Sequence, residues 1–155
     1  MSIKYSLDTS MLIGAWQRRL PHDVVPSFWK QLDGLVTGGV VRATDEVRRE
    51  LEKRDDAVFK WTEARPVLFV PMDATLWSAA QAIIQRFPEL TKPLTGRSAA
   101  DPFVVALAQL HGAAVVTEEQ PATKPGKTKI PDVCAALNIR CLTVYAFVRE
   151  RGWSF

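Results

Sequence analysis

The sequence has few of the residues that build zinc sites and disulfide frameworks. Its 155 residues include only two cysteines and two histidines. Cys134 and Cys141 are too few for a disulfide framework or a four-ligand zinc site. His22 and His111 are far apart in the sequence and match no metal-ligand spacing. We therefore expect both cysteines to be small buried thiols of a protein that works reduced, in the cytoplasm.

The sequence also lacks a long apolar run. The longest uninterrupted one, from Phe103 to Ala108, is far shorter than the roughly 20 residues that a transmembrane helix needs. Asp8 interrupts the segment that would have to be apolar in a signal peptide. We expect a protein that neither spans a membrane nor is secreted.

Charge of one sign is only slightly in excess. The net charge is +3 and the isoelectric point is near 9.0, which permits nucleic acid as a partner without demonstrating it. The basic residues are unevenly distributed, because the segment from Gln120 to Ile130 holds Lys124, Lys127 and Lys129 and no acidic residue. The segment is a candidate nucleic-acid contact, although a solvated connection between elements would have the same composition.

Short apolar and β-branched runs alternate with helical patterns along the chain. We expect strands at residues 3–7, 40–43, 67–70, 113–117 and 139–143. We expect helices at residues 11–19, 27–37, 44 onward, 57–64, 73–87, 98–111 and 131 onward, with a last helix reaching residue 155. No hairpin signal separates the strands, so they predict a parallel sheet with helices on both faces. The predicted fold is one three-layer α/β/α domain over residues 1–155, with a central, mainly parallel sheet of about five strands.

Capping residues mark several of the predicted helix ends. The expected N-caps are Thr9 or Ser10, Ser27, Thr44 and Asp73. Pro102 is compatible with a helix only in its first turn, and Gly112 is expected to end that helix.

Acidic residues follow several of the predicted strands. They are Asp8 after the first strand, Asp45 and Glu46 after the second, Glu118 and Glu119 after the fourth, and Asp101 at the start of the helix that leads into the fourth. Ligands of parallel sheets bind beyond the carboxyl ends of the strands, where these acids would meet. Ionised carboxylates so close together repel one another and need a cation. Oxygen ligands without a histidine or cysteine cluster favour Mg²⁺ or Mn²⁺.

Each acid taken singly also has a structural explanation. Asp8 could cap a helix, Glu46 could be a solvated first-turn charge, and Asp101 could be an ordinary N-terminal helix residue before a proline. Their joint position at one edge of the sheet is what favours a functional site.

Four segments, LDTSMLI, TDEVRREL, ADPFVVALA and VVTEE, resemble the motifs of PIN-domain nucleases, the fold of the VapC-like toxin ribonucleases. The region around Trp16 and Trp29 and the segment KIPDVCAAL resemble a less characterised bacterial PIN subfamily. The resemblance implies that Asp8, Glu46 and Asp101 bind metal. It also implies a fourth acid after the fourth strand, normally Asp. We expect Glu119 in this role, with Glu118 and Asp132 as alternatives.

The activity implied by the resemblance is hydrolysis of RNA phosphodiester bonds with one or two Mg²⁺ or Mn²⁺ ions, by the toxin of a type II toxin–antitoxin system. Ser10 would orient Asp8, and the expected contacts to the RNA backbone are Arg97, Lys124, Lys127 and Lys129. The expected partners are RNA, a small antitoxin protein and a second copy of the chain. Most of the five tryptophans are expected in the core, but Trp16 and Trp29 could instead form part of a groove for the antitoxin or the second copy.

Two other functions fit the same fold. One is a non-catalytic PIN module that binds RNA or protein, against which the retained acids argue. The other is a DNA-directed nuclease of the flap or repair kind, which usually carries more acids and helices for the duplex than 155 residues accommodate. Metal-dependent cleavage of single-stranded RNA, compared with flap DNA, discriminates among the three.

Overall fold

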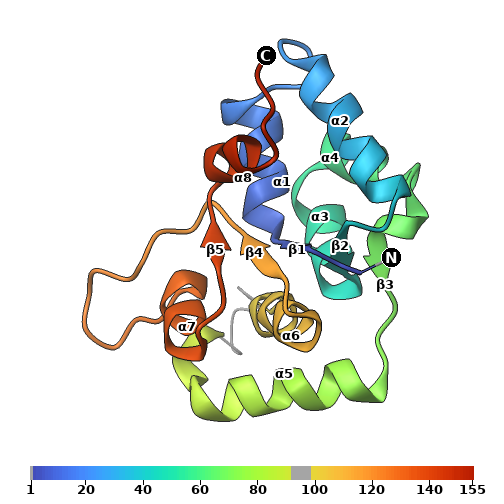
Figure 1. The fold of residues 1–155 in the computed structure, drawn as a ribbon. Helices are drawn as coiled ribbons and strands as arrows, with labels where there is room; N and C mark the ends of the chain where they lie inside the picture. Colours follow the sequence, from blue (N-terminus) through green and yellow to red (C-terminus); the bar gives the residue numbers. More distant parts are fainter. Residues whose placement is uncertain (1, 92–98) are drawn as a thin grey trace.

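A five-stranded parallel sheet forms the centre of the computed structural model, which describes residues 2–91 and 99–155 (Figure 1). The strands are β1 (Tyr5–Leu7), β2 (Val41–Thr44), β3 (Phe69–Val70), β4 (Ala114–Val116) and β5 (Cys141–Leu142). Their order across the sheet is β3-β2-β1-β4-β5, and all four pairings are parallel. The predicted parallel sheet of five strands is therefore confirmed. Because β1 lies between β2 and β4, the residues that follow these three strands share one edge.

Helices cover both faces of the sheet. They are α1 (Thr9–Gly14), α2 (Pro26–Thr37), α3 (Asp45–Arg54), α4 (Asp56–Glu63), α5 (Ala74–Arg86), α6 (Asp101–His111), α7 (Ile130–Leu137) and α8 (Val144–Glu150). In Figure 1 the helices α5, α6 and α7 lie on one side of the sheet, and α1 to α4 with α8 lie on the other. The predicted three-layer α/β/α fold is thus confirmed. None of the described helices has the length and apolarity needed to cross a bilayer.

Helix α6 is the most buried helix of the core. Its first eight residues, Asp101 to Ala108, are all buried, because α6 packs against the sheet on one side and against α5 and α7 on the others. The Ser6 hydroxyl of β1 donates to the Val104 carbonyl of α6, at 2.8 Å. Pro102 lies in the first turn and Gly112 ends the helix with φ of +61°, both as predicted.

The helix that follows β1 differs from the prediction in its cap and in its second half. Asp8 is the N-cap residue but makes no side-chain capping bond, and neither Thr9 nor Ser10 caps the helix. Their hydroxyls bind carboxylates instead. The predicted helix 11–19 continues beyond α1 as a π-helix over Ala15–Arg19.

Three further boundaries were predicted wrongly. Residues Pro66–Leu68 form a 3₁₀ turn, so β3 is shorter than the predicted strand 67–70; Pro66 favours the start of such a turn. Helix α2 begins at Pro26 rather than being capped by Ser27, because proline is favoured at the first helical position. Helix α8 ends at Glu150 rather than at residue 155, and Gly152 follows with φ of +70°. The predicted start of α6 at Ser98 lies outside the described residues.

The tryptophans divide between the core and the surface. Trp29 is 1% exposed and its indole N–H donates to the Leu20 carbonyl, so it cannot contribute to the surface groove suggested by the sequence. Trp16 is partly buried and stacks on the His22 ring, with ring centroids 4.6 Å apart. Trp77 of α5 is exposed. Both cysteines are free thiols; Cys134 is buried as expected, whereas Cys141 is only half-buried.

Candidate active site at the carboxyl edge of the sheet

Asp8 follows β1 at the centre of the carboxyl edge and is buried. One of its oxygens, Oδ2, accepts hydrogen bonds from the Ser10 hydroxyl at 2.6 Å and the Thr117 hydroxyl at 2.7 Å. Thr117 follows β4, the parallel neighbour of β1, which is why residues far apart in sequence meet here. Burial raises the pKa of the Asp8 carboxyl above its ordinary value, whereas these two hydrogen bonds act to lower it. Ser10, expected from the sequence to orient Asp8, thus makes a direct hydrogen bond to its carboxylate.

Glu50 brings a second carboxylate to this edge from the second turn of α3. Its Oε1 accepts from the Thr9 hydroxyl at 2.6 Å, and its Oε2 accepts from the Ala100 backbone N–H at 3.3 Å. The carboxylate is thus held between the start of α1 and the residue before α6. Two neighbouring elements fix the orientation of this side chain.

Glu119, which follows β4, is the third acid of the group. Burial, and next the nearby charge of Asp8, raises the pKa of Glu119 to about 7; Glu50 raises it further and Lys129 opposes the rise. The Lys129 ammonium lies 4.0 Å from Glu119 Oε1. We refer to Asp8, Glu50 and Glu119 as the acidic cluster, because the charges of Asp8 and Glu50 both act on Glu119.

The two alternatives to Glu119 have structural partners elsewhere. Glu118 points toward α8: its Oε1 accepts from the Val144 N–H at 3.0 Å, and its Oε2 lies 3.6 Å from the Arg19 guanidinium. A Cβ on Gly14 would come within 3.1 Å of its side chain. Asp132 caps the start of α7 and accepts two backbone N–H groups.

Asp101 and Glu46 occupy different surroundings. Asp101 is the first residue of α6, is 5% exposed, and directly follows Ala100, whose N–H binds Glu50. Glu46 lies in the first turn of α3, and its carboxylate pairs with Arg49 of the same helix. The contacts to neighbouring elements therefore belong to Glu50, four residues further on.

Sequence reasoning missed Glu50, although a signal was present. Residues four apart lie on the same face of a helix, so Glu46 and Glu50 share a face of α3. The acid closer to the strand was chosen from the sequence. Only tertiary packing, through Thr9 and Ala100, distinguishes the two glutamates.

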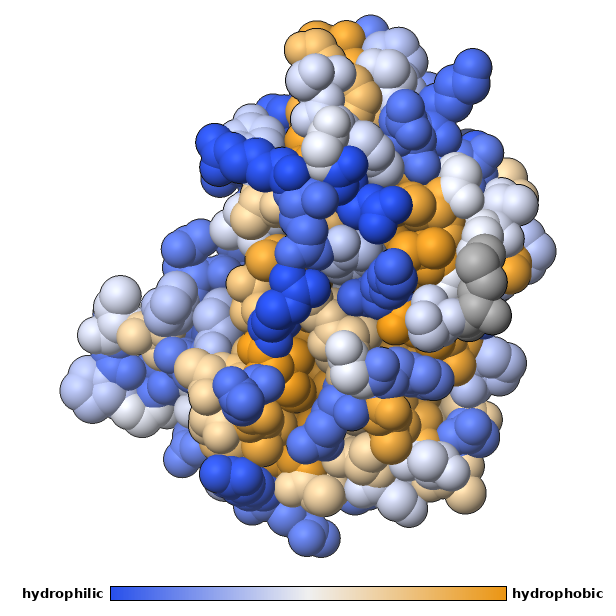
Figure 2. Space-filling view, viewed as in Figure 1, coloured by the Kyte–Doolittle hydropathy of each residue, from blue (hydrophilic) through white to orange (hydrophobic). Residues whose placement is uncertain are grey.

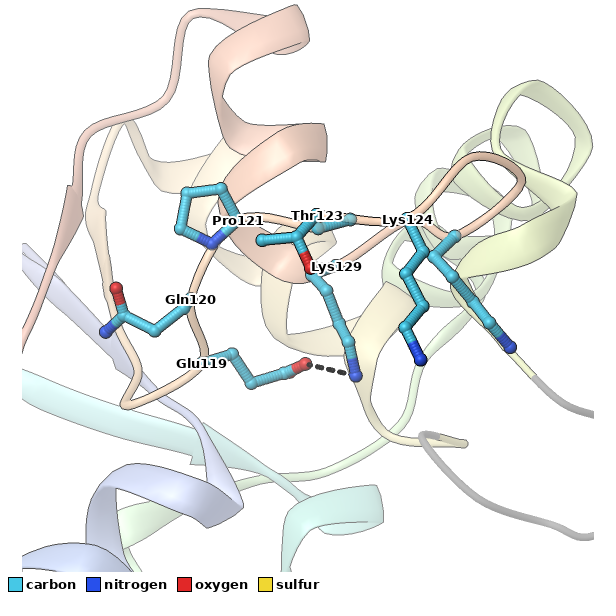
Figure 3. Close-up of a pocket in the computed structure, with 8 residues that line it drawn as sticks. Glu119, Gln120, Pro121, Thr123, Lys124 and Lys129 are labelled. Carbon is cyan, nitrogen blue, oxygen red and sulfur yellow. Dashed lines mark ion pairs between the residues drawn. The ribbon is translucent and has the colours of Figure 1, made fainter.

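Three of the four residues predicted to contact the RNA backbone lie among the described residues. Lys124, Lys127 and Lys129 line a cavity together with Glu119, whereas Arg97 lies outside the described residues. The lysines therefore lie on the same loop as one member of the acidic cluster (Figure 3).

The donor set of this edge fits a hard divalent cation. Its side-chain ligands are carboxylate and hydroxyl oxygens, which suit Mg²⁺ or Mn²⁺ better than zinc. The raised pKa values of Asp8 and Glu119 indicate negative charge that a cation would stabilise. Among the described residues, however, no three Asp, Glu, His or Cys side chains are gathered closely enough to hold a metal ion. Metal binding would have to draw these carboxylates closer together.

Comparisons with known proteins establish the family and the fold. Solved structures with the same fold include VapBC2 from Rickettsia felis bound to a DNA fragment from their promoter, with 12% identity, a TM-score of 0.54, and coverage of 91% of this chain and 98% of that chain. They also include FitAcB from Neisseria gonorrhoeae, with 16% identity, a TM-score of 0.51, and coverage of 89% and 96%. No curated protein sequence matches significantly. The family model "Domain of unknown function (DUF4411)" matches residues 5–155, so the chain belongs to this family, and its fold is PIN-like.

Proposed function

We propose that this protein is a metal-dependent endoribonuclease and the toxin of a toxin–antitoxin pair. The observation that carries the proposal is the acidic cluster: carboxylates from the end of β1 and from α3 both act on the carboxylate that follows β4, at the carboxyl edge of a PIN-like sheet. Two of these carboxylates have raised pKa values, that of the buried Asp8 and that of the partly buried Glu119. Shifted pKa values gathered in one location are more typical of functional sites than of surface ion pairs.

The residues proposed to hold the metal are Asp8, Glu50, Glu119 and Asp101. Glu50 replaces Glu46 in this set, because its carboxylate contacts α1 and the start of α6, whereas that of Glu46 pairs with Arg49. When bound, Mg²⁺ or Mn²⁺ would supply positive charge that offsets the carboxylates and the developing charge on the phosphodiester.

Three hydroxyl side chains would position these carboxylates. Ser10 and Thr117 both donate to Oδ2 of Asp8, which leaves Oδ1 as the oxygen free of these two hydroxyls. Thr9 donates to Oε1 of Glu50. Partners of this kind orient ligands, and their loss typically lowers metal affinity by about 10–100-fold.

The solved structures support an antitoxin partner, and the charge beside the acidic cluster supports a polyanionic substrate such as RNA. VapBC2 is a complex bound to DNA of its own promoter, and the fold of its toxin component is shared along nearly the whole chain. Three lysines beside the acidic cluster suit a polyanionic substrate. We extend the proposal to a small antitoxin protein as partner and to the cytoplasm as location.

The test is cleavage of single-stranded RNA by purified protein in Mg²⁺ or Mn²⁺, with Asp8→Asn as the inactive variant and flap DNA as the competing substrate. We expect the wild type to cleave RNA only with metal, and Asp8→Asn to be inactive. RNA binding without cleavage would instead support the non-catalytic module. Preferential cleavage of the flap would support the DNA nuclease.

A further inference from the structure

The loop between β4 and α7 has a defined shape. Asp132 closes it, because its Oδ2 accepts from the Ala122 N–H at 3.0 Å and from the Lys129 N–H at 2.9 Å. One carboxylate oxygen thus ties the two arms of the loop together. We refer to residues 119–129 as the basic loop. It projects from the left of the molecule in Figures 1 and 2, where its surface is mostly hydrophilic.

A tight turn at the tip of the basic loop brings two lysines together. The sequence there is Lys124-Pro125-Gly126-Lys127, and the Lys127 N–H donates to the Lys124 carbonyl at 3.3 Å. Gly126 has φ of +75°, the conformation required at the third position of a type II turn, and proline is favoured at the second. The ends of such a turn are less than about 7 Å apart, so the two lysines are neighbours.

The basic loop lines an open cavity of about 410 Å³. It is lined by Glu119, Gln120, Pro121, Ala122, Thr123, Lys124, Lys127 and Lys129. In Figure 3 the side chains of Lys124 and Lys129 extend from the loop in the same direction, and Lys129 is joined to Glu119 by an ion pair. Small-ligand sites commonly measure about 300–1,000 Å³, so the cavity has room for one unit of a larger ligand.

The position of the cavity beside the acidic cluster indicates the charge of its ligand. A polyanion that approached Asp8, Glu50 and Glu119 would be repelled unless cations flanked the approach. The three lysines supply such a flank, and among the described residues Glu119 is the only acid that lines the cavity. The described loop therefore combines an organised turn, a cavity and an excess of positive charge next to the proposed reaction centre.

We propose that the basic loop is a phosphate subsite that holds the backbone of an RNA strand beside the acidic cluster. Lys124 and Lys127 contact the phosphate of a nucleotide that flanks the cleaved bond. Lys129, whose ammonium already pairs with Glu119, lies between this subsite and the acids. The inference rests on the proposed ribonuclease function, but it concerns binding and can be measured without cleavage.

The first test measures binding of a single-stranded RNA oligonucleotide in an Asp8→Asn background without metal. Fluorescence anisotropy at several KCl concentrations gives the salt dependence of affinity. The test variant is Lys124→Gln with Lys127→Gln, and the control is Lys30→Gln with Lys60→Gln, which removes two exposed lysines from α2 and α4. Each lost phosphate contact reduces the slope of log affinity against log salt by about 0.7, so we expect a loss of about 1.4 in the test variant and little change in the control. Equal slopes in the two would overturn the subsite.

A second variant tests whether the shape of the loop matters. Gly126→Val keeps every charge but strains a residue with φ of +75°. We expect a severalfold loss of RNA affinity with an unchanged melting temperature of the whole protein. RNA affinity equal to that of the parent would mean that the lysines act only as diffuse charge, which contradicts an organised subsite.

Cleavage assays separate this inference from the proposed function. In the active protein we expect Lys124→Gln with Lys127→Gln to raise KM severalfold and to leave kcat within about twofold, because uniform binding is lost. If this variant cleaves RNA with an unchanged KM, the subsite is refuted and the proposed ribonuclease function still stands. If the protein cleaves no RNA but Lys124→Gln with Lys127→Gln still reduces the salt dependence of RNA affinity, the subsite is supported and the ribonuclease function is not. Competition by poly-glutamate as strong as that by RNA of equal charge would assign the loop to an acidic protein partner and refute the proposal.

Discussion

The acids at the two ends of the sheet have pKa values that are shifted in opposite directions. At the amino end, Glu150 accepts from the Tyr5 hydroxyl at 2.5 Å and pairs with the Arg140 guanidinium. The bond from Arg140, and then that from Tyr5, holds the pKa of Glu150 below its ordinary value. At the carboxyl end, burial raises the pKa values of both Asp8 and Glu119.

This difference distinguishes an acid whose charge is stabilised within the fold from the acids that we propose bind a cation. Glu150 has an arginine and a hydroxyl, which together stabilise its charged form. The acidic cluster has hydroxyl and backbone donors and, in Lys129, an ammonium at 4.0 Å from one oxygen. Charge without a full complement of counter-charges is costly to stability, and proteins retain it mainly where function requires it.

The largest expected effect separates Glu50 from Glu46. Glu50→Gln should lower the rate of metal-dependent RNA cleavage by about a hundredfold or more, because it removes a proposed ligand worth several kcal/mol of charge stabilisation. Glu46→Gln is the matched control on the same face of α3 and should change the rate by less than about threefold, since its loss costs only an exposed ion pair. Initial rates on one RNA substrate measure both. A larger loss in Glu46→Gln would return the metal-ligand role to that residue.

The next effect concerns the hydroxyls that hold Asp8. Thr117→Val removes the hydroxyl bond to Asp8 Oδ2 at similar volume, and Ser10→Ala removes the other. Each should weaken Mn²⁺ affinity by about 10–100-fold, as losses of ligand-orienting partners do. Calorimetric titration of Mn²⁺ gives these affinities. Ser27→Ala, at an exposed position in α2, is the control, and an affinity loss as large in this variant would show that the effect is not local.

A smaller effect is expected on the free energy of unfolding, and the pKa shift of Glu119 determines how this effect changes with pH. Because the pKa of Glu119 is raised from 4.5 to about 7 in the folded protein, its proton binds more tightly there than in the unfolded chain. Its contribution to stability is greatest below about 4.5 and is lost as the pH rises through about 7. Glu119→Gln without metal should therefore raise the unfolding free energy at pH 8 by about 1–3 kcal/mol and change it little at pH 4. Denaturant unfolding at the two pH values measures this, and a destabilised variant at pH 8 would contradict it.

The smallest effect belongs to the amino end and has the opposite sign. The lowered pKa of Glu150 gives stability that is present above its ordinary value and is lost as the pH falls through the folded value. Glu150→Gln should thus lower the unfolding free energy at pH 7 by at most about 1 kcal/mol, since the pair with Arg140 is partly exposed. A stabilised Glu150→Gln protein would remove the contrast between the two ends.

The general fold could be predicted because it depends on patterns that are local. Buried runs such as 113–117 and the absence of hairpin signals indicated parallel strands, and Asp73 and Gly112 marked helix ends that the structure confirms. The predicted boundaries were wrong where the effect of a nearby proline was overlooked. Pro66 started a 3₁₀ turn in place of a strand, and Pro26 took the helix start expected at Ser27.

The candidate site could be predicted only in part, because its geometry depends on side-chain direction. The edge that holds Asp8 and Glu119 could be predicted, because both residues follow strands that were expected to be parallel. The opposite directions of Glu118 and Glu119 could not, since adjacent residues after a strand point to different surroundings. The choice between Glu46 and Glu50 needed the contacts of α3 with Thr9 and Ala100, which join segments 41 and 50 residues apart.

The most direct test of the acidic cluster as a cation site is the melting temperature of wild type and Asp8→Asn, with and without Mn²⁺. Without metal, Asp8→Asn should melt higher than the wild type, because a buried charge has been removed. At a Mn²⁺ concentration 100 times its Kd, binding should stabilise the wild type by about 2.7 kcal/mol and reverse this order. An equal Mn²⁺ shift in both proteins, or none in the wild type, would contradict the account.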